Sequence, residues 1–150
     1  MTDAITASRL PVSALVADTV ARIAPGASLL EVADALNGGD VGALVVGEGD
    51  AVEGVVSERD LVRALAGRLD PATTRAIDVA TTKLVWCDAA AGVGEVATEM
   101  LDRYVRHVLV EEDGKLVGVV SARDLLGVYV ADDLADDLAD DMADDADDRR

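Results

Sequence analysis

Aromatic residues are almost absent from this 150-residue sequence, which contains no Phe, two Tyr and one Trp. Apolar residues still make up 51% of the chain, so a core must be built mainly from Val, Leu, Ile and Ala. Cysteine occurs once, at Cys87, and a single thiol cannot close a disulfide within one chain. This composition fits a protein of a reducing compartment.

Long apolar runs and a secretory signal are also missing. The run Ala43-Leu44-Val45-Val46 is far shorter than the roughly 20 residues that a membrane-spanning helix needs. The first ten residues lack the basic-then-apolar order of a signal peptide. We therefore expect a soluble, cytoplasmic protein that does not associate with a membrane.

Basic residues are scarce, with 13 Lys and Arg against 30 Asp and Glu, and the net charge is −17. Residues 131–150 hold ten Asp and two Arg, a charge of −8, and the remaining 130 residues carry −9. Non-specific binding to nucleic acid depends on clustered bases that neutralise phosphates. An excess of acid in both parts of the chain argues against a nucleic-acid partner.

Signatures of catalysis and of metal binding are missing too. The Walker A pattern and the glycine fingerprint of dinucleotide-binding folds do not occur. One His and one Cys cannot build a zinc site of the usual type, and no Ser, His and Asp stand at spacings that suggest a triad. The adjacent Asp pairs near the C-terminus lack the spacing of an EF-hand loop. We expect neither an enzyme nor a resident metal.

A repeated heptad is the strongest feature that the sequence does contain. Gly54-Val55-Val56-Ser57-Glu58-Arg59-Asp60 returns 64 residues later as Gly118-Val119-Val120-Ser121-Ala122-Arg123-Asp124. At the same offset, Glu31-Val32-Ala33 matches Glu95-Val96-Ala97. A unit of roughly 60 residues buries only a modest part of its surface. The two halves are therefore expected to be copies of one small unit that share a core.

Each copy reads as strand, helix, strand, strand, helix. In the first copy Ser28 and Glu31 form a capping-box pattern, and in the second Asp113-Gly114 is a strong turn signal. We expect a loose start at residues 1–11. The expected strands are residues 20–24, 43–46, 52–56, 84–86, 107–110 and 116–120. The expected helices are residues 29–36, 58–66 and 93–101 and a last helix from residue 122 on. This order predicts an α/β (α+β) fold with helices on one face of a small sheet.

The chain divides into two repeats and a tail. We assign residues 12–66 to the first repeat, 67–75 to a linker, 76–130 to the second repeat and 131–150 to an acidic tail. The tail repeats Ala-Asp-Asp followed by Leu or Met with a period of four. Because Asp is a poor helix former, the tail is expected to start as a helix and to fray or become disordered. Its expected role is solubility.

The repeated motif gives the chain a specific family resemblance. Two strand-helix-strand-strand-helix units, each ending in Gly, two apolar residues and Ser-x-x-Asp, resemble a tandem CBS-domain pair, or Bateman module, here a stand-alone one. The segments 40–46 and 104–110 resemble the second strand of that family, and the resemblance covers about residues 12 to 130. It implies two units packed sheet to sheet about a pseudo-twofold axis, two clefts between them, and association into a homodimer.

The resemblance also implies a function and its residues. Many members of the family are regulatory sensors of AMP, ADP, ATP or another adenosyl ligand. It implies that Asp60 and Asp124 bind the ribose hydroxyls and that Ser57 and Ser121 lie near the ribose or the phosphate. Basic residues of the partner copy would meet the phosphates, and the adenine would lie near the first strand of each copy; the remaining candidate residues are Arg59, Arg106, His107, Arg123, Val20, Ala21, Lys83 and Leu84.

Elementary chemistry agrees with a ligand at these positions. Free N–H groups and the helix dipole attract anions to helix N-termini, where both motifs are predicted. A carboxylate accepts two hydrogen bonds from a vicinal diol. A glycine inside a strand, as at Gly54 and Gly118, often marks close approach of another backbone or of a ligand. No obligatory cofactor is implied, and an adenine nucleotide is the expected regulatory ligand.

Other interpretations of the same residues stay open. Ser57 and Asp60 also have the form of a capping box, Arg59 and Arg123 could pair with surface carboxylates, and His107 could be a packed residue. The protein could then be a dimeric scaffold without a ligand, or a sensor of S-adenosylmethionine or NAD(H). The second copy has Arg106 and His107 where the first has glycine and alanine. We therefore predict that the two clefts differ and that the cleft using Asp60 binds phosphate more tightly.

Overall fold

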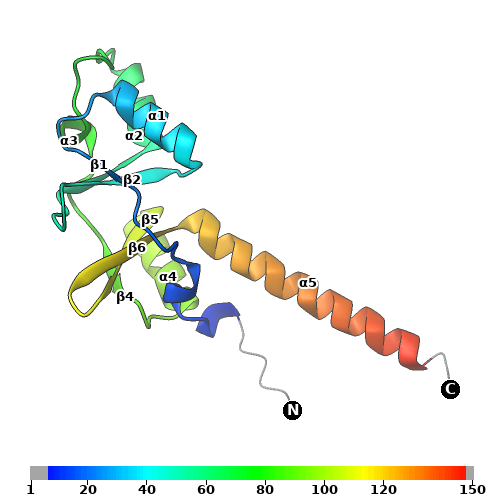
Figure 1. The fold of residues 1–150 in the computed structure, drawn as a ribbon. Coiled ribbons are helices and arrows are strands. Elements are labelled where there is room, and N and C mark those ends of the chain that lie inside the picture. The colour runs from blue at the N-terminus through cyan, green and yellow to red at the C-terminus, as the bar shows by residue number, and fades with distance from the viewer. Residues whose placement is uncertain (1–6, 148–150) are drawn as a thin grey trace.

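The computed structural model describes residues 7–147 and contains two three-stranded sheets, one from each repeat (Figure 1). The first repeat holds β1 (Arg22–Ile23), α1 (Leu29–Gly39), β2 (Ala43–Val46), β3 (Gly54–Ser57) and α2 (Glu58–Ala66). The second holds β4 (Trp86–Asp88), α4 (Val93–Arg103), β5 (His107–Glu112), β6 (Lys115–Ser121) and α5 (Ala122–Asp147). Two short 3-10 helices (Ala7–Arg9, Val12–Leu15) precede β1, and α3 (Ala76–Val79) lies between the repeats. The predicted fold class and element order are confirmed.

The two sheets have the same topology and the same register. In each, the first strand runs parallel to the second, and the second pairs antiparallel with the third. Val46 lies opposite Gly54 in the first sheet, as Val110 lies opposite Gly118 in the second. The offset of 64 residues in the sequence is therefore also an equivalence in space.

The sheets pack against each other through a cluster that both repeats supply. Val45 and Val55 of the first sheet and Leu109 of the second are buried together. Their other faces are covered by the helices, which complete a separate apolar cluster in each repeat. The predicted sheet-to-sheet packing is confirmed, with Val and Leu taking the place of aromatic residues.

Each repeat is completed by the segment that precedes the other repeat. Val12 is fully buried in the core of the second repeat, and its N–H donates to the carbonyl of Ala91 at 2.8 Å. Ala76 of α3 is fully buried in the core of the first repeat, and its N–H donates to the carbonyl of Ala27 at 2.7 Å. The segment before each repeat therefore packs into the core of the other repeat, and the repeat boundaries assigned from the sequence do not reveal this exchange.

The expected loose start was wrong for residues 7–11. Ala7 is buried, Leu10 accepts a hydrogen bond from the N–H of Val93 at 2.9 Å, and Pro11 pairs with Gly92. The apolar residues of this segment add to the core of the second repeat, which is why it is ordered. Residues 1–6 of the expected loose start lie outside the described residues.

The first strand of each repeat is shorter than predicted or shifted. Instead of residues 20–24, β1 spans Arg22–Ile23, and instead of residues 84–86, β4 spans Trp86–Asp88. These edge strands pair on one side only, with Arg22 opposite Val45 and Trp86 opposite Leu109. The apolar residues just before them leave the sheet and pack between the repeats, among them Val20 and Leu84.

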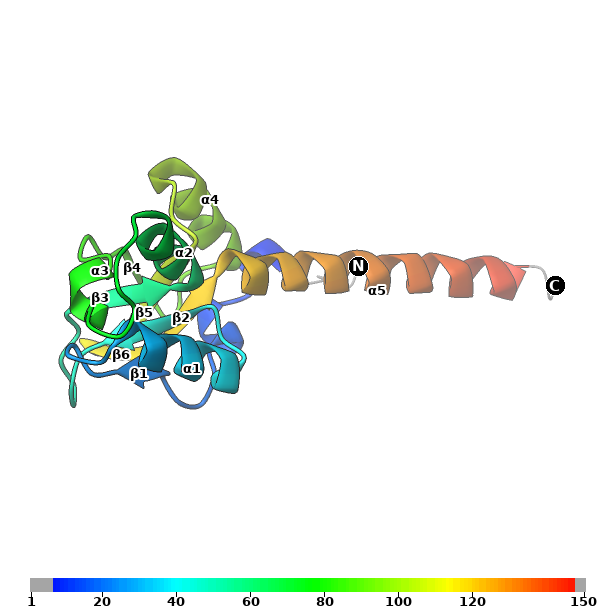
Figure 2. The ribbon, with the colours of Figure 1, turned by 90° about the horizontal axis from the view of Figure 1, so that it is seen from above.

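The last helix continues without a break from Ala122 to Asp147 and projects far beyond the body of the molecule (Figures 1 and 2). Nothing in the helix marks the boundary that the sequence suggests near residue 130. The part of the expected frayed end at residues 148–150 lies outside the described residues. No helix within residues 7–147 is both long and apolar enough to cross a membrane.

Removing the residues after Asp133 is expected to leave the fold intact. A hydrogen bond between α5 and the N-terminal segment joins the N–H of Ala7 to Oδ2 of Asp132 at 3.5 Å, and truncation after Asp133 keeps it. The deleted apolar residues Leu134 and Leu138 are exposed and contribute little burial. Thermal unfolding should shift by less than about 3 °C. A loss of folded protein would contradict this prediction.

Candidate ligand cavity between the repeats

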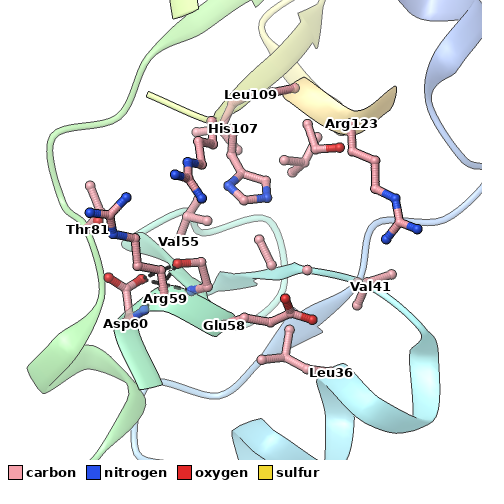
Figure 3. A pocket seen from close by; sticks show the side chains of 18 of the residues that line it. Leu36, Val41, Val55, Glu58, Arg59, Asp60, Thr81, His107, Leu109 and Arg123 are labelled. Atoms are coloured by element: carbon pink, nitrogen blue, oxygen red, sulfur yellow. Dashed lines mark hydrogen bonds between the residues drawn. The ribbon is translucent and has the colours of Figure 1, made fainter. Parts of the chain in front are cut away.

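A cavity of about 950 Å³ lies between the two repeats (Figure 3). All of the residues that the sequence singled out for ligand binding line it: Val20, Ala21, Ser57, Arg59, Asp60, Lys83, Leu84, Arg106, His107, Ser121, Arg123 and Asp124. They come from both repeats, because the sheet-to-sheet packing brings the two Ser-x-x-Asp motifs to one space. The resemblance implies two clefts, whereas here both motifs line one continuous cavity.

The first motif is a capping box at the start of α2. Ser57 is the N-cap, and its N–H and hydroxyl donate to Oδ2 of Asp60 at 2.8 and 3.0 Å. Asp60 is 9% exposed and is the only buried charged side chain within the described residues. Its Oδ1 accepts no hydrogen bond from them. The capping interpretation is confirmed, and one carboxylate oxygen is left for a ligand.

The second motif repeats the box in a more open setting. The Ser121 N–H donates to Oδ2 of Asp124 at 2.9 Å, and the Asp124 N–H donates to the Ser121 hydroxyl at 3.1 Å. Unlike Asp60, Asp124 is exposed. Burial strengthens a hydrogen bond to a carboxylate because less water competes for it. The two aspartates are therefore not equivalent, although each accepts a hydrogen bond from the N–H of the serine three residues before it.

His107 reaches across the boundary between the repeats. It begins β5 opposite Ser121, and its Nε2 lies 3.8 Å from the point where a Cβ on Gly42 would be. Burial lowers the pKa of His107 below its ordinary value of 6.5, while the carboxylates of Asp124, Asp60 and Glu58 oppose this shift and Arg106 adds to it. With its pKa below 6.5, the imidazole is largely neutral at pH 7.

The cations of the cavity are not used up by ion pairs. The two ion pairs found within residues 7–147 join Arg75 to Asp78 and Arg103 to Glu99, both outside the cavity. Arg59 and Arg123 approach the cavity from opposite sides of His107 (Figure 3). Neither guanidinium has a carboxylate within 4 Å in the described part of the chain. Both are available to an anionic ligand.

Several residues that line the cavity were missed by sequence reasoning. They include Arg63, Thr81, Glu58 and Asp40. For Arg63 a signal existed, since it stands three residues after Asp60 on the same helix face. Thr81 reaches the cavity because its backbone pairs with that of Val55, a contact between the repeats that spacing does not predict.

Cys87 and the acidic side chains are the remaining candidates for nucleophilic and metal chemistry among the described residues. Burial and the nearby carboxylates of Asp88 and Glu111 raise the pKa of Cys87 to about 11, so its thiol is protonated at neutral pH. No group of three or more His, Cys, Asp or Glu within residues 7–147 could hold a metal ion.

The sequence pattern of the CBS domain matches residues 12–67 and 76–131, most of the chain. The chain belongs to the CBS-domain family. Its two copies form a CBS-domain pair, and such pairs are regulatory modules that bind adenosine ligands.

Relatives and solved structures agree with this membership. Hypoxic response protein 1 of Mycobacterium tuberculosis is 36% identical over 88 residues, which cover 57% of this chain and 62% of that protein, so the match spans less than two thirds of the relative. A putative signal-transduction protein with CBS domains from Burkholderia ambifaria has a TM-score of 0.73 at 27% identity, covering 77% of this chain and 85% of that one. The CBS domain protein PAE2072 from Pyrobaculum aerophilum, complexed with AMP, has a TM-score of 0.69 at 30% identity, covering 81% and 99%.

Proposed function

We propose that this CBS-domain pair senses an adenine nucleotide, AMP, ADP or ATP, in the cavity between its repeats and signals its presence to a protein partner in the cytoplasm. The observation that carries the proposal is that the buried carboxylate of Asp60 lines the same cavity as Arg59 and Arg123, which form no ion pair with the described residues. A nucleotide needs both, because its ribose offers a diol and its phosphates are anions.

The proposed pose uses each part of the cavity. The ribose hydroxyls donate to Oδ1 of Asp60, the oxygen that the capping box leaves unused. The phosphate lies toward His107, Arg106 and Arg123, which belong to the second repeat. The adenine packs beside Val20, Ala21, Lys83 and Leu84, which line the same cavity. A ligand held by both repeats resists their separation, so its binding is linked to their relative arrangement.

Calorimetry with a panel of adenosyl ligands tests the proposal. AMP, ADP and ATP are the expected binders, and S-adenosylmethionine and NAD(H) represent the other adenosyl ligands. If only S-adenosylmethionine or only NAD(H) bound, that compound would take the place of the adenine nucleotide as the proposed ligand. No binding of any member would favour the ligand-free scaffold, for which the exposed apolar residues Leu30, Val62 and Leu65 of α1 and α2 are the supporting observation.

Replacing His107 by alanine is expected to weaken the binding of AMP by about tenfold and the binding of adenosine much less. A phosphate beside His107 raises the low pKa of the imidazole, so the complex holds more protons than the free protein. The affinity for AMP should therefore rise as the pH falls from about 8 to about 6, and this rise should be smaller in His107→Ala. Calorimetry at several pH values measures it. If the affinity of the variant for AMP changed with pH in the same way as that of the unchanged protein, the phosphate would not lie beside His107.

We also expect the protein to be a homodimer. Leu30 of α1 and Val62 and Leu65 of α2 are each more than half exposed, and neighbouring apolar residues of this kind commonly mark an interface. Light scattering should give about twice the chain mass of 15.5 kDa, and the double change Val62→Asp, Leu65→Asp should lower it. A single species near 15.5 kDa at micromolar concentration would contradict the expectation.

A further inference from the structure

The projecting end of α5 presents an apolar stripe that nothing in the described structure covers. This tail stripe consists of Leu134, Leu138 and Met142, which are 58, 64 and 75% exposed. In an α-helix, positions four apart differ by about 40° around the axis, so the three side chains share one face of about 80°. Figures 1 and 2 show this part of α5 standing clear of both repeats.

The stripe does not fit a tail that only keeps the protein soluble. Acidic segments with that role are poor in apolar residues, whereas here Leu or Met follows each of the first three Ala-Asp-Asp units. Asp is a poor helix former, and the many Asp pairs four apart repel each other. Such a helix gains little stability alone, and burial of the stripe against a partner would supply it.

Charge and periodicity together decide among the possible occupants. A second copy would bring another ten Asp in residues 131–150 against these ten. A left-handed coiled coil needs a mean apolar spacing of about 3.5 residues, and a spacing of four turns the stripe away from the partner helix. The chain's own body carries −9, and nucleic acids and anionic membranes repel the tail for the same reason.

We propose that the end of α5 is a docking helix for a protein partner whose apolar groove is rimmed by Lys and Arg. Leu134, Leu138 and Met142 enter the groove, in the way that amphipathic helices bind through anchors one turn apart. Asp133 and Asp137, both exposed beside the stripe, face the basic rim. The charges speed association and select basic partners, while the apolar anchors supply most of the affinity. This proposal does not depend on nucleotide binding.

A basic amphipathic peptide is the probe for the full-length protein. The peptide carries leucine along one helix face and lysine elsewhere, and a control peptide replaces each leucine by serine at equal charge. At about 0.15 M salt, fluorescence anisotropy should give binding of the leucine peptide at least about tenfold tighter than binding of the control. The triple change Leu134→Ser, Leu138→Ser, Met142→Ser should abolish this difference. The matched change Leu101→Ser, at a 77% exposed leucine of α4, should keep it.

Any of three outcomes would overturn the proposal. Equal binding of both peptides would show that the tail binds through its charge alone. An unaltered preference in the triple variant would show that the leucine peptide binds elsewhere on the protein. A mass in light scattering that falls when the tail stripe is changed to serine would make a second copy the occupant. Because all these substitutions lie in exposed positions, circular dichroism of the variants should keep the signal of the folded repeats.

Discussion

Replacing Asp60 by alanine is expected to weaken AMP binding by a hundredfold or more. The change removes the carboxylate oxygen that the two ribose hydroxyls would use, in a position that is 9% exposed. Hydrogen bonds to a buried charged group contribute about 1.5–3 kcal/mol each. Loss of two of them corresponds to roughly a hundredfold or more in the dissociation constant. Calorimetry of AMP on the folded variant measures the loss.

The capping role of Asp60 requires a matched control. Alanine also removes the acceptor for the Ser57 N–H, at a cost of about 1 kcal/mol in the free energy of unfolding. Asp60→Asn keeps an oxygen for that N–H but loses the charge, so it should fold normally and still lose most AMP affinity. If Asp60→Asn bound AMP as well as the unchanged protein, Asp60 would be only a cap.

Asp124→Ala is the second control, and it is expected to spare the stronger site. Asp124 is exposed, and the residues that correspond to Arg106 and His107 in the first repeat are Gly42 and Ala43. His107 nevertheless has both carboxylates near it, and Asp124 has the larger opposing effect on its pKa. Equal losses from both aspartate variants would therefore mean that one ligand uses both motifs and that the proposed asymmetry is wrong.

The sequence predicted the fold well because the repeat is visible in the residues themselves. Two copies of a motif at one offset fix the order of elements, and capping boxes at Ser28 and Ser57 fix where two helices begin. What it could not predict is the exchange of leading segments between the repeats. That exchange depends on contacts such as those of Val12 and Ala76 across the domain boundary, and local periodicity carries no information about them.

The candidate residues could be predicted, but the shape of their cavity could not. Every predicted residue lines the cavity because the two motifs end strands of sheets that pack face to face. Whether a carboxylate is buried, and whether two clefts merge, depends on how closely the sheets approach. Asp60 and Asp124 have the same local sequence pattern and the same capping hydrogen bonds, yet only Asp60 is buried.

Gly118 leaves the space that one of the exchanged segments occupies. Its replacement is expected to have the second large effect. A Cβ at Gly118 would lie 2.5 Å from Cβ and Cγ1 of Val16, in the segment that leads into the first repeat. The strand glycine therefore makes room for the segment that holds Val16, and Gly54 does the same toward the carbonyl of Thr81 at 3.0 Å. Neighbouring backbone must move to admit the methyl group.

Gly118→Ala should lower the free energy of unfolding by about 1–3 kcal/mol, which corresponds to roughly 3–10 °C in thermal unfolding. The matched change is Gly127→Ala in α5, where a Cβ meets nothing within 4 Å and alanine favours the helix by about 1 kcal/mol. It should raise the melting temperature. In the double variant Val16→Gly, Gly118→Ala the loss should be smaller than the sum of the two single losses, because removal of the Val16 side chain relieves the contact. Additive losses would show that Val16 does not set the requirement for glycine at this position.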